Sequence, residues 1–145
     1  MHNSTQVTDH SAVIDLLPKS NEFCIAITNA FSKKDTRQLL RSAQKNGFCP
    51  ADDKYPSSYR NNSRLQIDNQ ILARRLYKEI IDYVPEFLDI EGEKLCLHSL
   101  NERLRYCKYE NGQEFRVHQD GSYRPEPRLQ SKLTFLMYLN DGEDY

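Results

Sequence analysis

Glycine and long hydrophobic runs are scarce in this 145-residue chain. Only five glycines are present, fewer than a complete β-rich fold needs for its tight turns and bulges. Apolar residues, counted with glycine and without tyrosine, make up about 35% of the chain, against about 45–50% in an average soluble domain, so we expect a thin core. No apolar run approaches the roughly 18 residues of a membrane span, so no membrane partner is expected.

Net charge and closely spaced cysteine pairs are also lacking. The 20 lysines and arginines nearly balance the 21 aspartates and glutamates, so no global field favours a nucleic-acid partner. The four cysteines include no C-x-x-C pair, which favours free thiols over a zinc site or a disulfide framework. Residues 1–13 have neither the basic nor the apolar segment of a secretory signal, and we therefore expect a cytoplasmic protein.

The length is that of a single domain, and two helices are predicted within it. Residues 1–11 are polar and without periodicity, and are expected to form a disordered lead-in. Ser32 begins a capping-box pattern, followed by apolar residues at helical spacing, which predicts a helix over 33–45. Asp68 is expected to cap a second helix, whose apolar face ends at Pro85.

Extended segments dominate the remainder. A short apolar run and three stretches with period-2 or extended character predict strands at 23–27, 102–109, 115–120 and 132–140. Helices that precede antiparallel strands indicate an α+β domain.

His118 and Asp120 form the sharpest chemical feature of the sequence. In an extended strand, residues two apart project from the same face, so an imidazole and a carboxylate can bind one metal ion from adjacent directions. They correspond to two of the three ligands in the facial triad of non-haem Fe(II) oxygenases. Taken alone, a His-x-Asp pair is more often two solvated residues on a surface strand.

The residues around this pair carry a longer pattern. Residues 105–120 read R-Y-x-x-Y-x-x-G-x-x-F-x-x-H-x-D, and residues 131–140 read S-x-L-T-F-x-x-Y-L-N. Together they resemble the Fe(II)/2-oxoglutarate-dependent dioxygenases of the prolyl 4-hydroxylase-like family. The similarity extends more weakly upstream and covers about residues 22–140.

The resemblance implies a fold, a reaction and a set of site residues. The fold would be N-terminal helices packed on a jelly-roll (double-stranded β-helix) core, and the reaction would be a hydroxylation coupled to decarboxylation of 2-oxoglutarate to succinate. Fe(II), 2-oxoglutarate and ascorbate are the implied cofactors, and the substrate is a protein or a small molecule. The matching positions are His118 and Asp120 for the metal, Tyr109 and Tyr138 for 2-oxoglutarate, and, loosely, Arg60 and Asn62 for the substrate.

The sequence departs from this family after Asp120. Relatives place a second histidine ligand several strands later, followed by an arginine or lysine that pairs with 2-oxoglutarate. Only 25 residues follow Asp120 here, and none is histidine. We therefore expect residues 12–145 to be the N-terminal portion of a single oxygenase domain, with only the first barrel strands, and to be weakly active or inactive alone.

Two other readings stay open. One alternative is a catalytically incomplete fragment that acts, if at all, as a non-enzymatic binding protein. A nucleic-acid-binding module is supported only by Arg103, Arg105 and scattered tyrosines, and the balanced charge argues against it.

Overall fold

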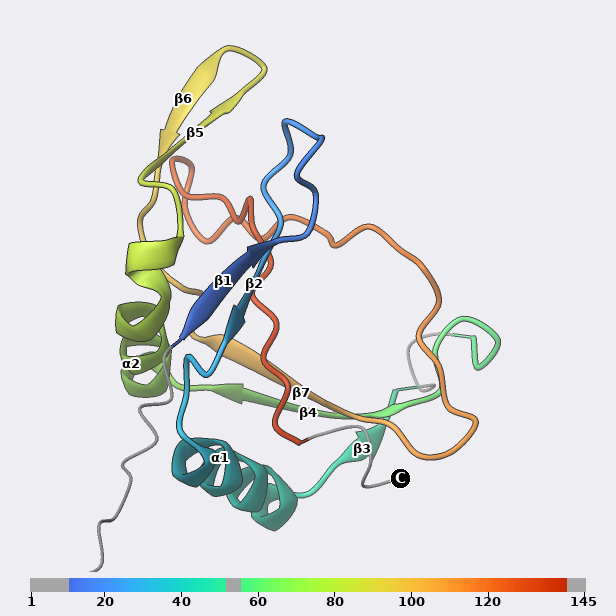
Figure 1. Ribbon diagram of the computed structural model, residues 1–145. Helices are drawn as coiled ribbons and strands as arrows, with labels where there is room; N and C mark the ends of the chain where they lie inside the picture. Colours follow the sequence, from blue (N-terminus) through green and yellow to red (C-terminus); the bar gives the residue numbers. More distant parts are fainter. Residues whose placement is uncertain (1–10, 52–55, 141–145) are drawn as a thin grey trace, which may run out of the picture.

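The computed structural model describes residues 11–51 and 56–140, which combine helices with antiparallel strands (Figure 1). This mixture is of the α+β class that the sequence predicts. The elements, in chain order, are β1 (Ala12–Asp15), β2 (Ile25–Thr28), α1 (Lys33–Asn46), β3 (Cys49–Pro50), β4 (Ser63–Asp68), α2 (Gln70–Ile80), a 3₁₀ turn (Ile81–Tyr83), β5 (Phe87–Ile90), β6 (Glu93–Cys96) and β7 (Arg103–Lys108).

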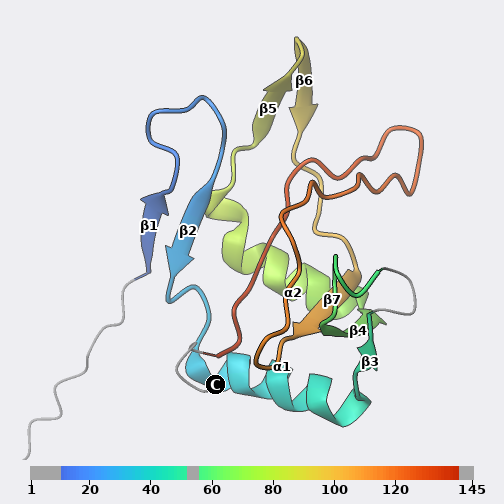
Figure 2. The same cartoon turned by 90° about the vertical axis from the view of Figure 1, so that its right-hand side faces the viewer.

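The strands form three separate antiparallel sheets in the described residues. The central one has the order β3-β4-β7, and β4 and β7 pair from Ser63 opposite Lys108 to Asp68 opposite Arg103. The other two are the β1–β2 pair and the β5–β6 hairpin, which projects away from the helices (Figures 1 and 2). The sequence did not predict β1 or this hairpin, whereas the strands expected at 23–27 and 102–109 correspond to β2 and β7.

Helix α1 begins and ends where local signals place it. The Ser32 hydroxyl accepts a hydrogen bond from the Asp35 amide at 3.2 Å and donates one to the Asp35 carboxylate at 2.6 Å. At the other end, Gly47 has φ +80°, and its amide donates to the carbonyl of Ala43. A residue without Cβ adopts this left-handed conformation at no steric cost, so glycine ends the helix. The helix predicted at 33–45 is confirmed.

Helix α2 is also present, but the predicted cap is wrong. The side chain of Asn69, not of Asp68, accepts the hydrogen bond from Leu72 N at 2.9 Å. Asp68 is the last residue of β4, and both its carboxylate oxygens accept hydrogen bonds from Arg103 at 2.9 Å. The helix also ends at Ile80, ahead of Pro85, because the chain tightens into the 3₁₀ turn.

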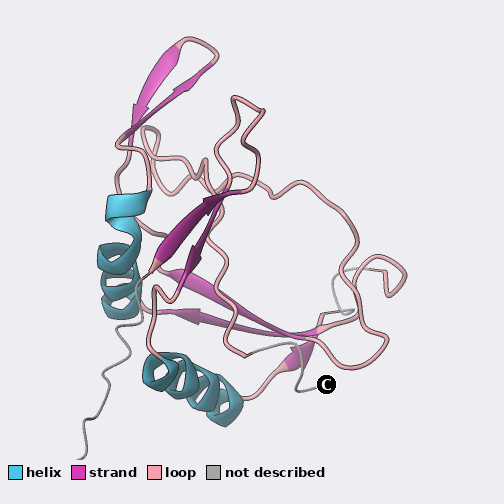
Figure 3. Ribbon diagram, in the orientation of Figure 1, coloured by secondary structure: helices cyan, strands magenta, loops and turns pink. Residues whose placement is uncertain are grey.

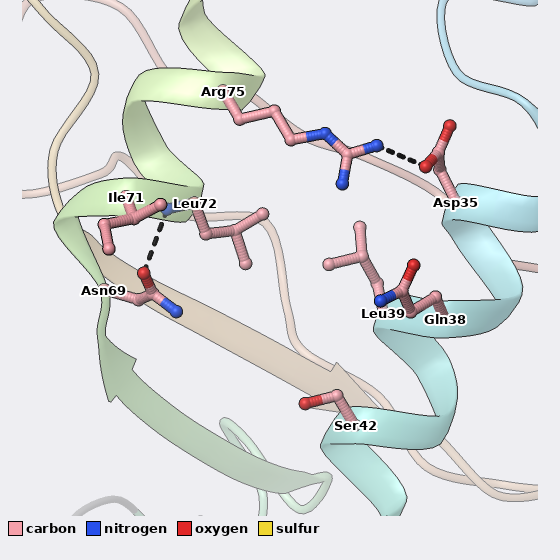
Figure 4. A pocket seen from close by; sticks show the side chains of 8 residues that line it. All are labelled: Asp35, Gln38, Leu39, Ser42, Asn69, Ile71, Leu72 and Arg75. Atoms are coloured by element: carbon pink, nitrogen blue, oxygen red, sulfur yellow. Dashed lines mark hydrogen bonds and ion pairs between the residues drawn. The ribbon is translucent and has the colours of Figure 1, made fainter.

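A shallow groove of about 320 Å³ separates α1 from α2 (Figure 4). An ion pair between Asp35 and Arg75 joins the two helices across it.

Neither described helix is long and apolar enough to cross a membrane. The core is thin, as the composition predicts. The buried apolar side chains among the described residues are those of Ala43, Ala51, Ala73, Leu76 and Ile80.

The strands predicted at 115–120 and 132–140 are not formed; both segments are irregular in Figure 3. Residues 115–120 contribute a single bridge, between Phe115 and Arg60. Residues 132–140 make no backbone hydrogen bond with another described residue, although exposed and half-buried side chains alternate from Thr134 to Asn140 as the period-2 pattern predicts. A strand needs backbone hydrogen bonds to a neighbouring segment, and none of the described residues makes such bonds with residues 132–140. The described residues therefore do not show the jelly-roll core that the resemblance implies.

Candidate functional site

His118 and Asp120 face each other in the loop that follows β7. The Nε2 atom of His118 lies 3.2 Å from Oδ1 of Asp120. Two donor atoms in neighbouring positions of an octahedral metal ion lie about 3 Å apart when each bond is about 2.1 Å long. The two side chains thus fit two adjacent ligand positions of one octahedral ion, even though the strand that was expected to align them is absent.

The hydrogen bonds of His118 fix which ring nitrogen is free. Nδ1 lies 2.8 Å from the carbonyl oxygen of Arg116, and a carbonyl can only accept, so Nδ1 carries the proton. In the neutral ring, Nε2 is then an acceptor that faces a carboxylate, which is another acceptor. Two acceptors that face each other in this way can share one cation. A backbone carbonyl behind a histidine is also the usual arrangement for a metal-binding imidazole.

Asp120 is held from its other oxygen. The hydroxyl of Thr134 donates a hydrogen bond of 2.7 Å to Oδ2, so Oδ1 is left to face His118. Thr134 lies in the second part of the sequence pattern, which spans residues 131–140. The contact between the two parts of the pattern therefore forms without a sheet.

The imidazole of His118 stacks on the ring of Phe115. The two ring centroids are 3.7 Å apart with an angle of 27° between the planes. The guanidinium carbon of Arg60 lies 4.0 Å from the centroid of the Phe115 ring. This stacking leaves the His118 side chain 27% exposed, whereas the side chain of Asp120 is 56% exposed.

Arg60 and Asn62 are the buried polar residues of the described chain, with 6% and 0% exposure. Arg60 donates from Nε to Oδ1 of Asn62 at 2.7 Å and from Nη2 to the sulfur of Cys107 at 3.2 Å. The Asn62 amide donates to the carbonyl of Ser63 at 3.0 Å. These contacts connect the loop before β4 to β7 and, through Phe115, to His118.

Tyr109 and Tyr138 lie close enough to interact electrostatically. Burial, foremost, and the nearby Cys107 raise the pKa of Tyr109, while the positive charges of Arg60 and Arg64 oppose that rise. Tyr109 is half-buried, whereas Tyr138 is 86% exposed. Of the residues predicted for 2-oxoglutarate, Tyr109 thus lies near Arg60 and Arg64, and Tyr138 lies mostly in solvent.

The described residues bring no third metal ligand to this site, because they contain no group of three or more His, Cys, Asp or Glu side chains placed to hold one ion. His98 lies in an exposed segment after β6. His2 and His10 fall outside the described residues.

Sequence reasoning did not single out Phe115, Arg116 or Thr134 as partners of the ligand pair. The phenylalanine belongs to the pattern that precedes His118, so its position three residues upstream is a usable signal. The Arg116 contact uses a backbone carbonyl, which no residue type reveals. The threonine is 14 residues from its partner Asp120, and only the folded loop brings them together.

Comparisons with protein-family models, with curated proteins and with solved structures found no match. The interpretation of the site therefore depends on its geometry and on the sequence pattern.

Proposed function

We propose that this chain carries part of an Fe(II)- and 2-oxoglutarate-dependent dioxygenase of the prolyl 4-hydroxylase-like type. The observation that carries the proposal is the 3.2 Å approach of His118 Nε2 to Asp120 Oδ1, with each side chain held from its other side. This arrangement presents one nitrogen and one oxygen donor to a single cation. Borderline and hard donors of this kind suit divalent iron.

In this proposal His118 and Asp120 hold the metal. Bound Fe(II) supplies the oxidising chemistry by which O₂ and 2-oxoglutarate give succinate, CO₂ and a hydroxylated substrate, and ascorbate keeps the iron reduced. Tyr109 and Tyr138 contact 2-oxoglutarate, and the loop that carries Arg60 and Asn62 approaches the substrate, although these two side chains are themselves buried. The jelly-roll core would then be completed by strands that pair with residues 132–140, whose backbone has no partner among the described residues.

A second candidate is a binding protein without catalysis. It is favoured by the lack of a third metal ligand in the described residues and by the unpaired segment 132–140. Both candidates keep the His118–Asp120 pair, so they differ in turnover and not in the presence of the site.

Metal binding and turnover test the proposal separately. Mn(II) serves as an oxygen-stable probe for Fe(II), and its free concentration is read from its electron paramagnetic resonance signal. We expect the chain to bind Mn(II), His118→Ala and Asp120→Ala to lose most of that affinity, and His98→Ala to keep it. Equal binding by all four proteins would refute the metal site.

Turnover is then measured with Fe(II), ascorbate and 2-oxoglutarate by the formation of succinate. We expect little or none from the 145-residue chain, because two ligands and no cationic anchor hold the metal and co-substrate weakly. Fast turnover that His118→Ala abolishes would support the dioxygenase and contradict the expectation that the chain holds only part of the catalytic site. Weak turnover by the chain that is absent in His118→Ala would support the dioxygenase and also its expected incompleteness.

A further inference from the structure

We propose that Arg60 is a positioning residue for His118 and acts through the ring of Phe115. The inference deepens the proposed function, on which it rests, because it assigns a role toward the metal ligand to a residue that the sequence pattern places near the substrate. It depends on a continuous series of contacts from β4 to the His118–Asp120 pair.

The first part of the series is a three-layer stack. The Arg60 guanidinium lies 4.0 Å from the centroid of Phe115, and the His118 ring lies 3.7 Å from that centroid. The backbones of Arg60 and Phe115 also form a bridge. The Arg60 guanidinium and the His118 imidazole thus both contact the Phe115 ring. An aromatic ring attracts a cation that lies over its face.

The second part fixes the guanidinium itself. Its Nε donates to Asn62 and its Nη2 to Cys107, so two bonds in different directions define its plane. The planar fork of arginine makes such paired bonds, whereas the point charge of lysine does not. Because Arg60 is 6% exposed and Asn62 fully buried, the packing around them leaves the guanidinium little freedom to turn.

The third part connects the same loop to the other side of the imidazole. Residue Tyr59, next to Arg60, accepts a hydrogen bond at 3.1 Å from the amide of Arg116. The carbonyl of Arg116 receives the Nδ1 proton of His118. The 59–60 segment therefore controls both the face of the ring, through Phe115, and its edge, through Arg116.

The geometry fits positioning better than contact with a substrate. The whole residue Arg60 is 6% exposed, so it presents little surface to an incoming molecule. Its effect on the site is instead to hold the ring plane in which Nε2 faces Asp120. Outer partners of metal-binding histidines typically change metal affinity by about 10–100-fold when they are removed.

Nuclear magnetic resonance tests the inference without metal. The Phe115 ring shifts the ring protons of His118 upfield because the two rings are stacked. We expect Phe115→Leu to remove this shift, Phe115→Tyr to keep it and Arg60→Met to reduce it strongly. Arg41→Met, on the exposed side of α1, is the matched control and should leave the shift unchanged.

Mn(II) affinity tests the consequence. Arg60→Met and Phe115→Leu should each weaken binding by about 10–100-fold, and the double variant should lose little more than either, because both act on one contact series. Phe115→Tyr should bind like the unchanged chain. Circular dichroism checks folding, and Arg60→Lys replaces Arg60→Met if the latter is unfolded, with the same losses expected.

An unchanged His118 shift and an unchanged Mn(II) affinity in the Arg60 variant would overturn the inference. If His118→Ala itself leaves Mn(II) binding unchanged, the proposed function fails. The metal-free shift still decides in that case whether Arg60 positions His118, so the two failures are distinguishable.

Discussion

Replacing the buried Asn62 by alanine should destabilise the fold more than replacing its half-buried neighbour Asn61. The side chain is fully buried, accepts from Arg60 at 2.7 Å and donates to the Ser63 carbonyl at 3.0 Å. Alanine leaves a charged donor and a carbonyl without these partners and opens a cavity. A lost bond to a charged group contributes about 1.5–3 kcal/mol, so with the cavity we expect a loss of about 2–4 kcal/mol.

This loss is large against the roughly 5–15 kcal/mol by which a domain is stable. In a domain of this length the melting temperature should fall by about 6–12 °C. Urea unfolding followed by circular dichroism measures the change directly. Asn62→Asp, which keeps the acceptor for Arg60, should lose less than alanine.

Asn61→Ala is the neighbouring control. Its side chain accepts one hydrogen bond from the Glu114 amide at 2.7 Å and is half-buried, so about 0.5–1.5 kcal/mol is expected. A structural role for the buried Asn62 is ruled out if Asn62→Ala stays within about 0.5 kcal/mol of the unchanged chain, or if Asn61→Ala destabilises it more.

Three further outcomes are expected. Ser32→Ala removes the cap of α1 and should cost about 1 kcal/mol in urea unfolding, whereas Ser32→Asp should not. The hydrogen bond from Arg103 lowers the pKa of Asp68. The pair therefore stabilises the fold above the ordinary carboxyl pKa of about 3.9, and this stabilisation is lost as the pH falls through the lowered value. Unfolding measured between pH 3 and pH 7 should show that Arg103→Met loses less stability on acidification than the unchanged chain. Thr134→Val should weaken Mn(II) binding by about 2–5-fold through Asp120, with Thr134→Ser unaffected and little change in unfolding, because the contact is exposed.

Local signals in the sequence predicted the helices well. For α1, the capping serine, the spacing of Leu39, Leu40 and Ala43, and the glycine after the helix all act within a few residues of one another. The choice between Asp68 and Asn69 as the second cap could not be made locally. It depends on Arg103, which lies 35 residues away and takes the aspartate into the β4–β7 ladder.

The unpaired segment shows what a periodic pattern can and cannot predict. Alternation along residues 132–140 correctly indicates that Phe135 faces inward, where it packs near Phe31, and that Leu136 faces out. Strand formation depends on a partner backbone, which alternation does not supply.

The candidate site was predictable in part. The sequence pattern singled out His118 and Asp120, and the structure places them together. The burial of Arg60 and Asn62 was not predictable, because the loop composition around them suggests a solvated segment. Their partner Cys107 is 47 residues from Arg60, and only the tertiary fold reveals that contact.

An anaerobic titration with Fe(II) and 2-oxoglutarate tests directly whether His118 and Asp120 hold the metal. A 2-oxoglutarate chelate of protein-bound Fe(II) absorbs visible light through charge transfer from the metal. We expect this band to appear with the unchanged chain, above the signal of the two reagents in buffer, and to be absent with His118→Ala and Asp120→Ala. A band of equal strength in these two variants would contradict this expectation, as would no band with the unchanged chain at saturating Fe(II) and 2-oxoglutarate.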